Sequence, residues 1–260
     1  MLKLSPCIEM LWKDVPFPER IKRAAATGYK AYEFWSWWDK DLDAIERSAK
    51  DAGLATAVCC VNTPWSGEDS MVNKGSAKTV AKAVKDCIPV GKRLGCSTFI
   101  ITTGNELEGV PRDEQHKACV AAMKAAGKVA EDAGLTLALE PLNVVVDHKG
   151  YYLSSSAEAF QMMKEVDSPA VKILFDIYHQ QVGEGNVVRN ITRNIDKIGH
   201  FHVADNPGRN EPGTGEMNYE FILSKIRESG YDGYIGLEFS ASDPARTDDI
   251  MRNVLRLAEV

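Results

Sequence analysis

Short apolar runs rich in β-branched residues alternate with longer amphipathic stretches along the whole chain. The short runs are typical of buried strands, and the longer stretches repeat their apolar positions with the period of a helix. Eight strands are predicted, at residues 3–8, 31–35, 55–61, 98–102, 136–140, 172–176, 199–203 and 234–239. Helices are predicted at residues 18–27, 41–52, 76–94, 112–133, 155–165, 187–197, 219–229 and 243–258.

This alternation predicts an α/β fold in which the strands pair in parallel. Eight strand–helix units close most naturally into a (β/α)8 TIM barrel, and 260 residues suit one such barrel. The alternative is an open doubly wound sheet, which would require a glycine-rich phosphate loop where the sequence reads Glu9-Met10-Leu11-Trp12. Because no linker or low-complexity run interrupts the pattern, we expect residues 1–260 to form a single domain.

Composition and charge narrow the classes of partner. The formal net charge of -6 at pH 7 leaves no surplus to neutralise a phosphate backbone, so we expect no nucleic acid partner. The six cysteines form no CxxC pair, and we expect them to act as small core residues rather than disulfides. Pro6 and Glu9 interrupt any signal-peptide core, and no apolar run reaches the length of a membrane span, so we expect a cytoplasmic protein with no membrane partner.

The last four predicted strands each carry an ionisable residue at or near their carboxyl ends. In a barrel these ends meet at one rim, and an ionisable group in an apolar run is costly unless it is paired or bound to a cation. Three carboxylates at one rim would repel one another, and a divalent cation removes that repulsion. The four predicted metal ligands are Glu140, Asp176, His202 and Glu238.

The donor set favours Mn²⁺, with Mg²⁺ or Co²⁺ as alternatives and Zn²⁺ left open. Each residue taken alone has a simpler interpretation. Asp176 is a candidate cap for the next helix, His202 a candidate core histidine, and Glu140 a candidate partner of a lysine. The occurrence of all four at the ends of consecutive strands favours the metal site.

Other polar residues fall near the same rim. His179 and Arg209 are predicted to bind substrate, together with Glu33 and Asn143, although Glu33 also fits a surface ion pair and Asn143 a turn. The five tryptophans follow the first three predicted strands, where an aromatic wall over the pocket and ordinary packing are equally supported; they are Trp12, Trp35, Trp37, Trp38 and Trp65.

Four stretches resemble the hydroxypyruvate isomerase family, within the xylose-isomerase-like superfamily of sugar isomerase and epimerase barrels. They read ALEPLN, FDIYHQQ, GHFHVADNPGRNEPGTGEMNY and GYIGLEF, and the likeness is strongest over residues 135–239. It implies that the four residues named above hold the metal and that Glu140 and Glu238 also exchange protons with the substrate. It further implies that His179 and Arg209 bind substrate oxygens.

The chain also departs from that family. Many members carry a histidine soon after the ExxN motif and a proline before the next glycine–aromatic pair, whereas this segment reads NVVVDHKGYY, with His148 displaced and Lys149 in place of proline. Some members carry glutamine where this chain has His202, and in this respect the chain is closer to the ketose 3-epimerases.

The expected function is metal-dependent isomerisation or epimerisation of a small sugar or sugar acid. Proton transfer by Glu140 and Glu238 through an enediolate is the expected mechanism. A ketose 3-epimerase and a C-glycoside deglycosidase-type lyase are alternatives on the same barrel. A DNA-repair endonuclease would need more ligands than five histidines readily supply, and a sugar-binding protein would not need two opposed glutamates. We expect a homo-oligomer, or a hetero-subunit if the chain is a lyase.

Overall fold

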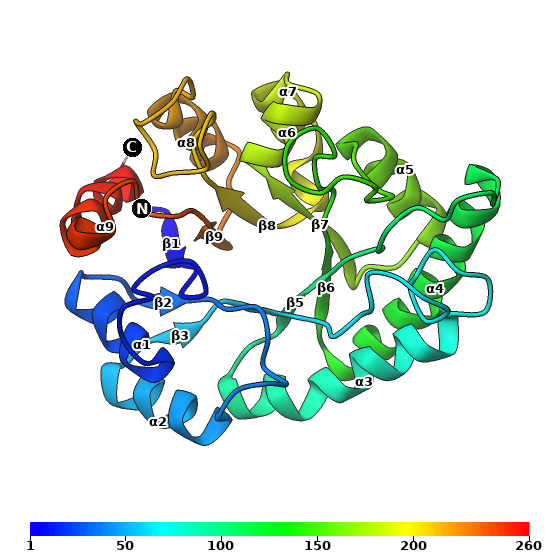
Figure 1. Ribbon diagram of the computed structural model, residues 1–260, viewed down its shortest axis with the longest axis horizontal. Helices are drawn as coiled ribbons and strands as arrows, with labels where there is room; N and C mark the ends of the chain where they lie inside the picture. The colour runs from blue at the N-terminus through cyan, green and yellow to red at the C-terminus, as the bar shows by residue number, and fades with distance from the viewer. Residues whose placement is uncertain (260) are drawn as a thin grey trace.

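Parallel strands curl around a central axis and helices cover the outside in this computed structural model (Figure 1). Residues 1–259 are described, so Val260, the last residue of the expected domain, lies outside the described residues. Seven strands form one parallel sheet in the order β1-β9-β8-β7-β6-β5-β4. The strands of this sheet are β1 (Lys3–Pro6), β4 (Val58–Cys60), β5 (Thr98–Ile101), β6 (Thr136–Leu139), β7 (Val171–Asp176), β8 (Ile198–Val203) and β9 (Tyr234–Leu237).

Two short strands, β2 (Ala31–Tyr32) and β3 (Ala55–Thr56), fill the gap between β1 and β4. Glu33 follows β2 and pairs with the end of β1 and the residues after it: its N–H donates to the Pro6 carbonyl (3.0 Å), and its carbonyl accepts from the Ile8 N–H (3.0 Å). The N–H of Ala57, between β3 and β4, donates to the carbonyl of Tyr32 (2.8 Å). Residues 55–60 thus act as one strand, and the predicted (β/α)8 barrel is confirmed.

The helices agree with the sequence pattern within a few residues at their ends. They are α1 (Phe17–Ala26), α2 (Leu42–Ala52), α3 (Ala77–Leu94), α4 (Arg112–Ala133), α5 (Ser156–Val166), α7 (Val187–Asn194), α8 (Tyr219–Glu228) and α9 (Thr247–Leu255). Short 3-10 turns follow α7 and flank α9, namely η1 (Ile195–Lys197), η2 (Pro244–Arg246) and η3 (Arg256–Glu259). Among the described residues, no helix has the length and apolar character needed to cross a membrane.

One further helix, α6 (Ile177–Gly183), was not predicted from the sequence. It starts directly after β7, and Asp176 is its N-cap: the Oδ1 atom accepts a hydrogen bond from the backbone N–H of His179 at 2.9 Å. Side chains on this short helix are therefore placed close to the end of β7.

The interior of the barrel has an apolar side and a polar side. On the apolar side Val58, Ile100, Ala138 and Leu174 form a separate buried cluster. Ser5, Glu33 and His200 are buried on the other side, and the Ser5 hydroxyl donates to Glu33 at 2.7 Å. All six cysteines are free thiols and five of them are buried, as expected for small core residues.

Candidate active site and metal centre

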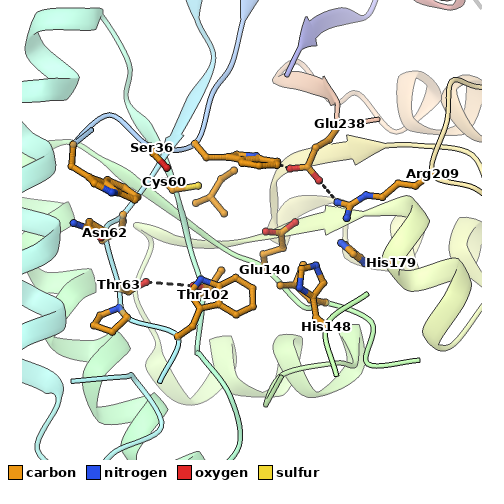
Figure 2. A pocket seen from close by; sticks show the side chains of 17 residues that line it. Ser36, Cys60, Asn62, Thr63, Thr102, Glu140, His148, His179, Arg209 and Glu238 are labelled. Atoms are coloured by element: carbon orange, nitrogen blue, oxygen red, sulfur yellow. Dashed lines mark hydrogen bonds and ion pairs between the residues drawn. The ribbon is translucent and has the colours of Figure 1, made fainter. Parts of the chain in front are cut away.

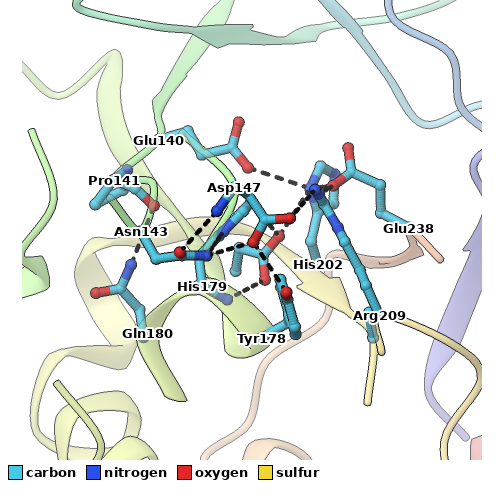
Figure 3. A network of polar contacts seen from close by, with 12 residues as sticks. Glu140, Pro141, Asn143, Asp147, Tyr178, His179, Gln180, His202, Arg209 and Glu238 are labelled. Carbon is cyan, nitrogen blue, oxygen red and sulfur yellow. Dashed lines mark hydrogen bonds and ion pairs between the residues drawn. The ribbon is translucent and has the colours of Figure 1, made fainter. Parts of the chain in front are cut away.

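The structure brings the four predicted ligands together at the carboxyl ends of β6 to β9, where all are buried (Figure 3). His202 Nδ1 lies at the centre of the cluster. It is 3.4 Å from Glu140 Oε1, 3.4 Å from Glu238 Oε2 and 3.9 Å from Asp176 Oδ2. Four residues distant in sequence therefore direct one imidazole nitrogen and three carboxylates at a common point.

This donor set fits a divalent cation. Glu140 Oε1 and His202 Nδ1 are buried and have no hydrogen-bond partner, an arrangement that costs free energy unless another group satisfies these atoms. Ligand atoms of the same three carboxylates also lie within 4.8 Å of one another and of a ring nitrogen of His179, while His202 has this spacing with Glu33 and His200. Carboxylate oxygens with one imidazole match a hard or borderline cation.

The protonation states point the same way. Burial raises the pKa of Glu140, and the nearby charges of Glu238 and Asp176 raise it further, while His202 opposes the rise. Burial also acts to raise the pKa of Glu238, but His202 and Arg209 outweigh it, so that this pKa is lowered. Burial lowers the pKa of His202, but the surrounding carboxylates raise it well above its ordinary value. The buried negative charge thus favours uptake of positive charge at this point, which a bound cation would supply.

Glu33, which the sequence predicts as a substrate-binding residue, lies beside His200 and His202 and is not among the residues that line the cavity. Its Oε2 atom is 3.1 Å from His200 Nε2, and its Oε1 atom is 3.1 Å from His202 Nε2. Burial raises the pKa of Glu33, but the two imidazoles outweigh it and lower the pKa to about 2. Gly236 on β9 makes room for the carboxylate, because a Cβ there would lie 2.3 Å from Glu33 Oε1. Glu33 is therefore placed to orient His202.

A cavity of about 370 Å³ opens above the cluster, and Glu140, Glu238, His179 and Arg209 line it (Figure 2). His179 extends from α6 and is completely buried, and its Nε2 atom has no hydrogen-bond partner. Asn143 lies behind it and does not line the cavity: its amide Nδ2 is 2.6 Å from His179 Nδ1. The Asn143 Oδ1 atom accepts from the backbone N–H of Val146 (2.9 Å), so its amide group donates to the ring. The proton of a neutral His179 ring is therefore on Nε2, which lies 3.6 Å from Asp176 Oδ2.

Arg209 belongs to the loop between β8 and α8 and has a left-handed backbone φ of 53°. Its Nη2 donates to Glu238 Oε2 at 2.5 Å, while its buried Nε has no partner. Its guanidinium also lies 5.3 Å from the centre of the Tyr178 ring. Arg209 thus neutralises Glu238 and keeps one donor available.

Asp147 connects these groups and was missed in the sequence (Figure 3). Its Oδ2 accepts from the Tyr178 hydroxyl (2.9 Å) and from Asn143 Nδ2 (2.8 Å), and its Oδ1 is 3.8 Å from Arg209 Nη1. Asp147 therefore connects Arg209, which lines the cavity, to Tyr178 and Asn143, which do not. The only signal in the sequence was the local departure from the family motif.

The tryptophans divide between the two roles that the sequence left open. Trp35, Trp38 and Trp65 line the cavity, and the Trp35 Nε1 donates to Glu238 Oε1 at 2.8 Å. Trp12 and Trp37 do not line it, and their Nε1 atoms donate to Asp248 and to the Cys60 carbonyl. The tryptophan bond to Glu238 is a contact that the sequence did not indicate.

Several known proteins are similar to this chain over nearly its whole length. Hydroxypyruvate isomerase of Escherichia coli strain K12 is 29% identical over 244 residues, which are 92% of this chain and 93% of the relative. The 2-oxo-tetronate isomerase of Haemophilus influenzae is 30% identical over 244 residues, again 92% and 93% of the two chains.

Solved structures agree on the fold. An AP endonuclease of family 2 from Brucella melitensis matches with a TM-score of 0.88 and 26% identity over 96% of each chain. A D-psicose 3-epimerase from Clostridium cellulolyticum H10 matches with a TM-score of 0.78 and 16% identity over 98% of each chain, a likeness of fold alone. The family model described as xylose isomerase-like TIM barrel matches residues 21–259. The resemblance carried by the sequence motifs is thereby confirmed, and the chain belongs to the xylose isomerase-like TIM barrel family.

Proposed function

We propose that this chain is a divalent-metal-dependent isomerase or epimerase of a small sugar or sugar acid, most like hydroxypyruvate isomerase, formed by one barrel domain. The isomerase names of relatives that match over most of the chain support the class of reaction. One observation carries the metal dependence. The buried His202 Nδ1 has no hydrogen-bond partner and lies within 4 Å of three carboxylates.

In this proposal the metal ligands are Glu140, Asp176, His202 and Glu238, and Mn²⁺ suits them best. The bound cation supplies Lewis-acid polarisation of the substrate carbonyl, which acidifies the neighbouring carbon. His179 Nε2 and Arg209 Nε are buried donors without a partner, and they bind and orient substrate oxygens.

Glu140 and Glu238 form the proton-transfer pair. Their environments differ, since burial raises the pKa of Glu140 whereas His202 and Arg209 overcome the effect of burial on Glu238 and lower its pKa. Two carboxyl groups whose pKa values are separated in this way are suited to act as acid and base. One glutamate of the pair accepts the proton from carbon, and the other returns a proton to the substrate. In the reverse reaction the roles exchange.

DNA repair is the alternative raised by the similar AP endonuclease. The net charge of -6 argues against it, and so does a cavity in which Arg209 is the one lysine or arginine among the described lining residues. A protein that only binds sugars is a further alternative, and mutation of one glutamate tests it. In such a protein the mutation would leave the affinity for the ligand nearly intact.

The test replaces each glutamate of the pair with glutamine, which keeps the size and one carbonyl oxygen. We expect turnover to fall roughly 10²-fold to 10⁴-fold in Glu140→Gln and in Glu238→Gln, as is typical when an acid or base is lost. The matched control is Glu158→Gln, which removes a glutamate–arginine ion pair with Arg112 on the outer surface. Elemental analysis should give about one divalent ion per wild-type chain.

The isotope experiment follows the proton itself. In D₂O the wild-type protein should introduce deuterium at the carbon next to the carbonyl, because a carboxylic acid proton exchanges with solvent. Product without deuterium at every degree of conversion would indicate a hydride shift. Near-normal turnover in both glutamine variants would show that the pair is wrongly assigned.

A further inference from the structure

The cavity above the carboxylates has two chemically different ends (Figure 2). The proposed reaction takes place at the charged end, where Glu140, Glu238, His179 and Arg209 lie. Ser36, Asn62, Thr63 and Thr102 face this group from the other end, from segments that follow β2, β4 and β5. No lysine, arginine, aspartate or glutamate lines this second end among the described residues. We call it the neutral end.

Two indole rings of the cavity wall remain partly open to solvent. Trp38 is 42% exposed and Trp65 is 40% exposed. Neighbouring aromatic rings hold both side chains in place. The ring centres of Trp65 and Tyr151 are 5.2 Å apart, and those of Trp38 and Trp37 are 5.6 Å apart. Exposed aromatic surface held rigidly beside a cavity is typical of a ligand site.

The polar groups of the neutral end are free to bind a ligand. The only contact between two of them is a long one of 3.4 Å between the hydroxyls of Thr63 and Thr102. Ser36 uses its backbone groups for contacts with Glu9 and Lys40, and within the described part of the chain its hydroxyl has no protein partner. Hydroxyl and amide groups that alternate with aromatic faces match the hydroxyl edges and C–H faces of a sugar.

Charge distinguishes the two ends of the cavity. Within the described lining the one lysine or arginine is Arg209 at the charged end, where it pairs with Glu238 at 2.5 Å and lies 3.8 Å from Asp147. An acidic group placed at the neutral end would therefore lose hydration without gaining a charged partner, whereas hydroxyl groups would find hydrogen-bonding partners there.

We propose that the neutral end is a binding site for the uncharged, polyhydroxylated tail of a neutral ketose of about hexose size. The inference rests on the proposed function and names its substrate class. A cavity of about 370 Å³ is within the usual range of roughly 300–1,000 Å³ for small-molecule sites. A three-carbon acid held at the charged end would leave the Ser36 hydroxyl and the Asn62 amide at the other end without a ligand partner.

The first experiment compares D-fructose and D-psicose with hydroxypyruvate on the Mn²⁺-loaded protein, with deuterium uptake from D₂O as the measure of proton transfer. We expect kcat/KM for a ketohexose to exceed that for hydroxypyruvate by at least about tenfold, the value of one or two added hydrogen bonds and a stacked ring. Equal or better turnover of hydroxypyruvate would overturn the proposal.

The second experiment uses variants of the neutral end. Asn62→Ala and Trp65→Ala should each raise KM for the ketohexose roughly tenfold and leave kcat within about twofold, because neither residue touches the reacting carbons. Phe221→Ala on α8 is the matched control, since Phe221 is an aromatic residue 50% exposed that does not line the cavity. Unchanged KM in both cavity variants would contradict the proposal.

Calorimetric titration of D-fructose into the same proteins separates this inference from the proposed function. If no compound takes up deuterium, the proposed isomerase reaction fails. The neutral end still stands in that case if D-fructose binds at least about tenfold more tightly than hydroxypyruvate and Asn62→Ala removes the difference. Equal affinities of the two compounds would overturn the proposal for the neutral end, whether or not deuterium uptake is observed.

Discussion

Replacing Glu33 with glutamine tests whether this residue supports the metal centre or contacts the substrate. The substitution keeps the size of the side chain and removes the charge that faces both His200 and His202 at 3.1 Å. A carboxylate beside the distal nitrogen of a ligating imidazole fixes the orientation of the ring and raises its basicity. Glu33→Gln therefore weakens the contact that orients the His202 ring, and it leaves the residues that line the cavity unchanged.

The expected loss of metal affinity is about 10-fold to 100-fold, which corresponds to roughly 1.4–2.7 kcal/mol. The free energy of unfolding should also fall, since Glu33 is buried and breaking one partner of a buried pair costs about 3–5 kcal/mol. The pKa of Glu33 is lowered to about 2, so its contribution to stability is complete above the ordinary glutamate pKa. That contribution is lost as pH falls toward 2, and the variant should lack this acid-dependent loss.

The assay is a calorimetric Mn²⁺ titration followed by kcat and KM at saturating metal. In Glu33→Gln we expect weaker metal binding and an unchanged substrate KM. Glu211→Gln is the matched control, because Glu211 is a buried carboxylate whose partners are the backbone and side chain of Ser242. Unchanged metal affinity together with a raised KM would refute this reasoning and restore Glu33 as a substrate contact.

Three further predictions concern the rim of the pocket. Asp147→Asn should raise substrate KM about tenfold with little change in melting temperature, because Asp147 is in contact with both Tyr178 and Arg209 while its own side chain is partly exposed. His179→Ala should reduce activity per folded molecule far more than melting temperature, and the reverse outcome would identify a core histidine. Burial and the charges of His179 and Arg209 lower the pKa of His148 to about 4, so His148→Gln should leave the kcat/KM profile unchanged between pH 5 and 8. The wild-type contribution of His148 to stability should rise as pH increases from about 4 to its ordinary pKa near 6.5.

The strands could be predicted because their apolar runs are short, separated by helices and interrupted by ionisable residues at one end. Glu140, Asp176 and Glu238 were recognisable for that reason, since each ends or follows a buried strand. Their convergence required only the rule that parallel strands of a barrel end at the same rim. The helix α6 was missed because the apolar character of β7 continues into Ile177 and Tyr178, which hides the boundary.

Depth within the barrel could not be predicted from the pattern. A strand pattern shows whether a side chain points inward or outward, but the level that it reaches depends on strand tilt and stagger. Glu33 follows a strand of only two residues and contacts both His200 and His202 without lining the cavity. The indirect sign was Gly236 on β9, whose missing side chain leaves the space that Glu33 occupies. Asn143 was predicted at the substrate site; in the structure its side chain contacts His179 Nδ1 and does not line the cavity.

Asp176 shows that two interpretations treated as alternatives in the sequence are compatible in the structure. Its Oδ1 atom caps α6 through the N–H of His179 at 2.9 Å, while its Oδ2 atom points toward His202 Nδ1 at 3.9 Å. One carboxylate thus joins the proposed metal centre to the helix that carries His179. An α-helix turns by about 100° per residue, so starting α6 one residue later would rotate His179 away from the cavity. The position of the proposed substrate-binding histidine therefore depends on the helix cap, and the cap is supplied by a proposed metal ligand.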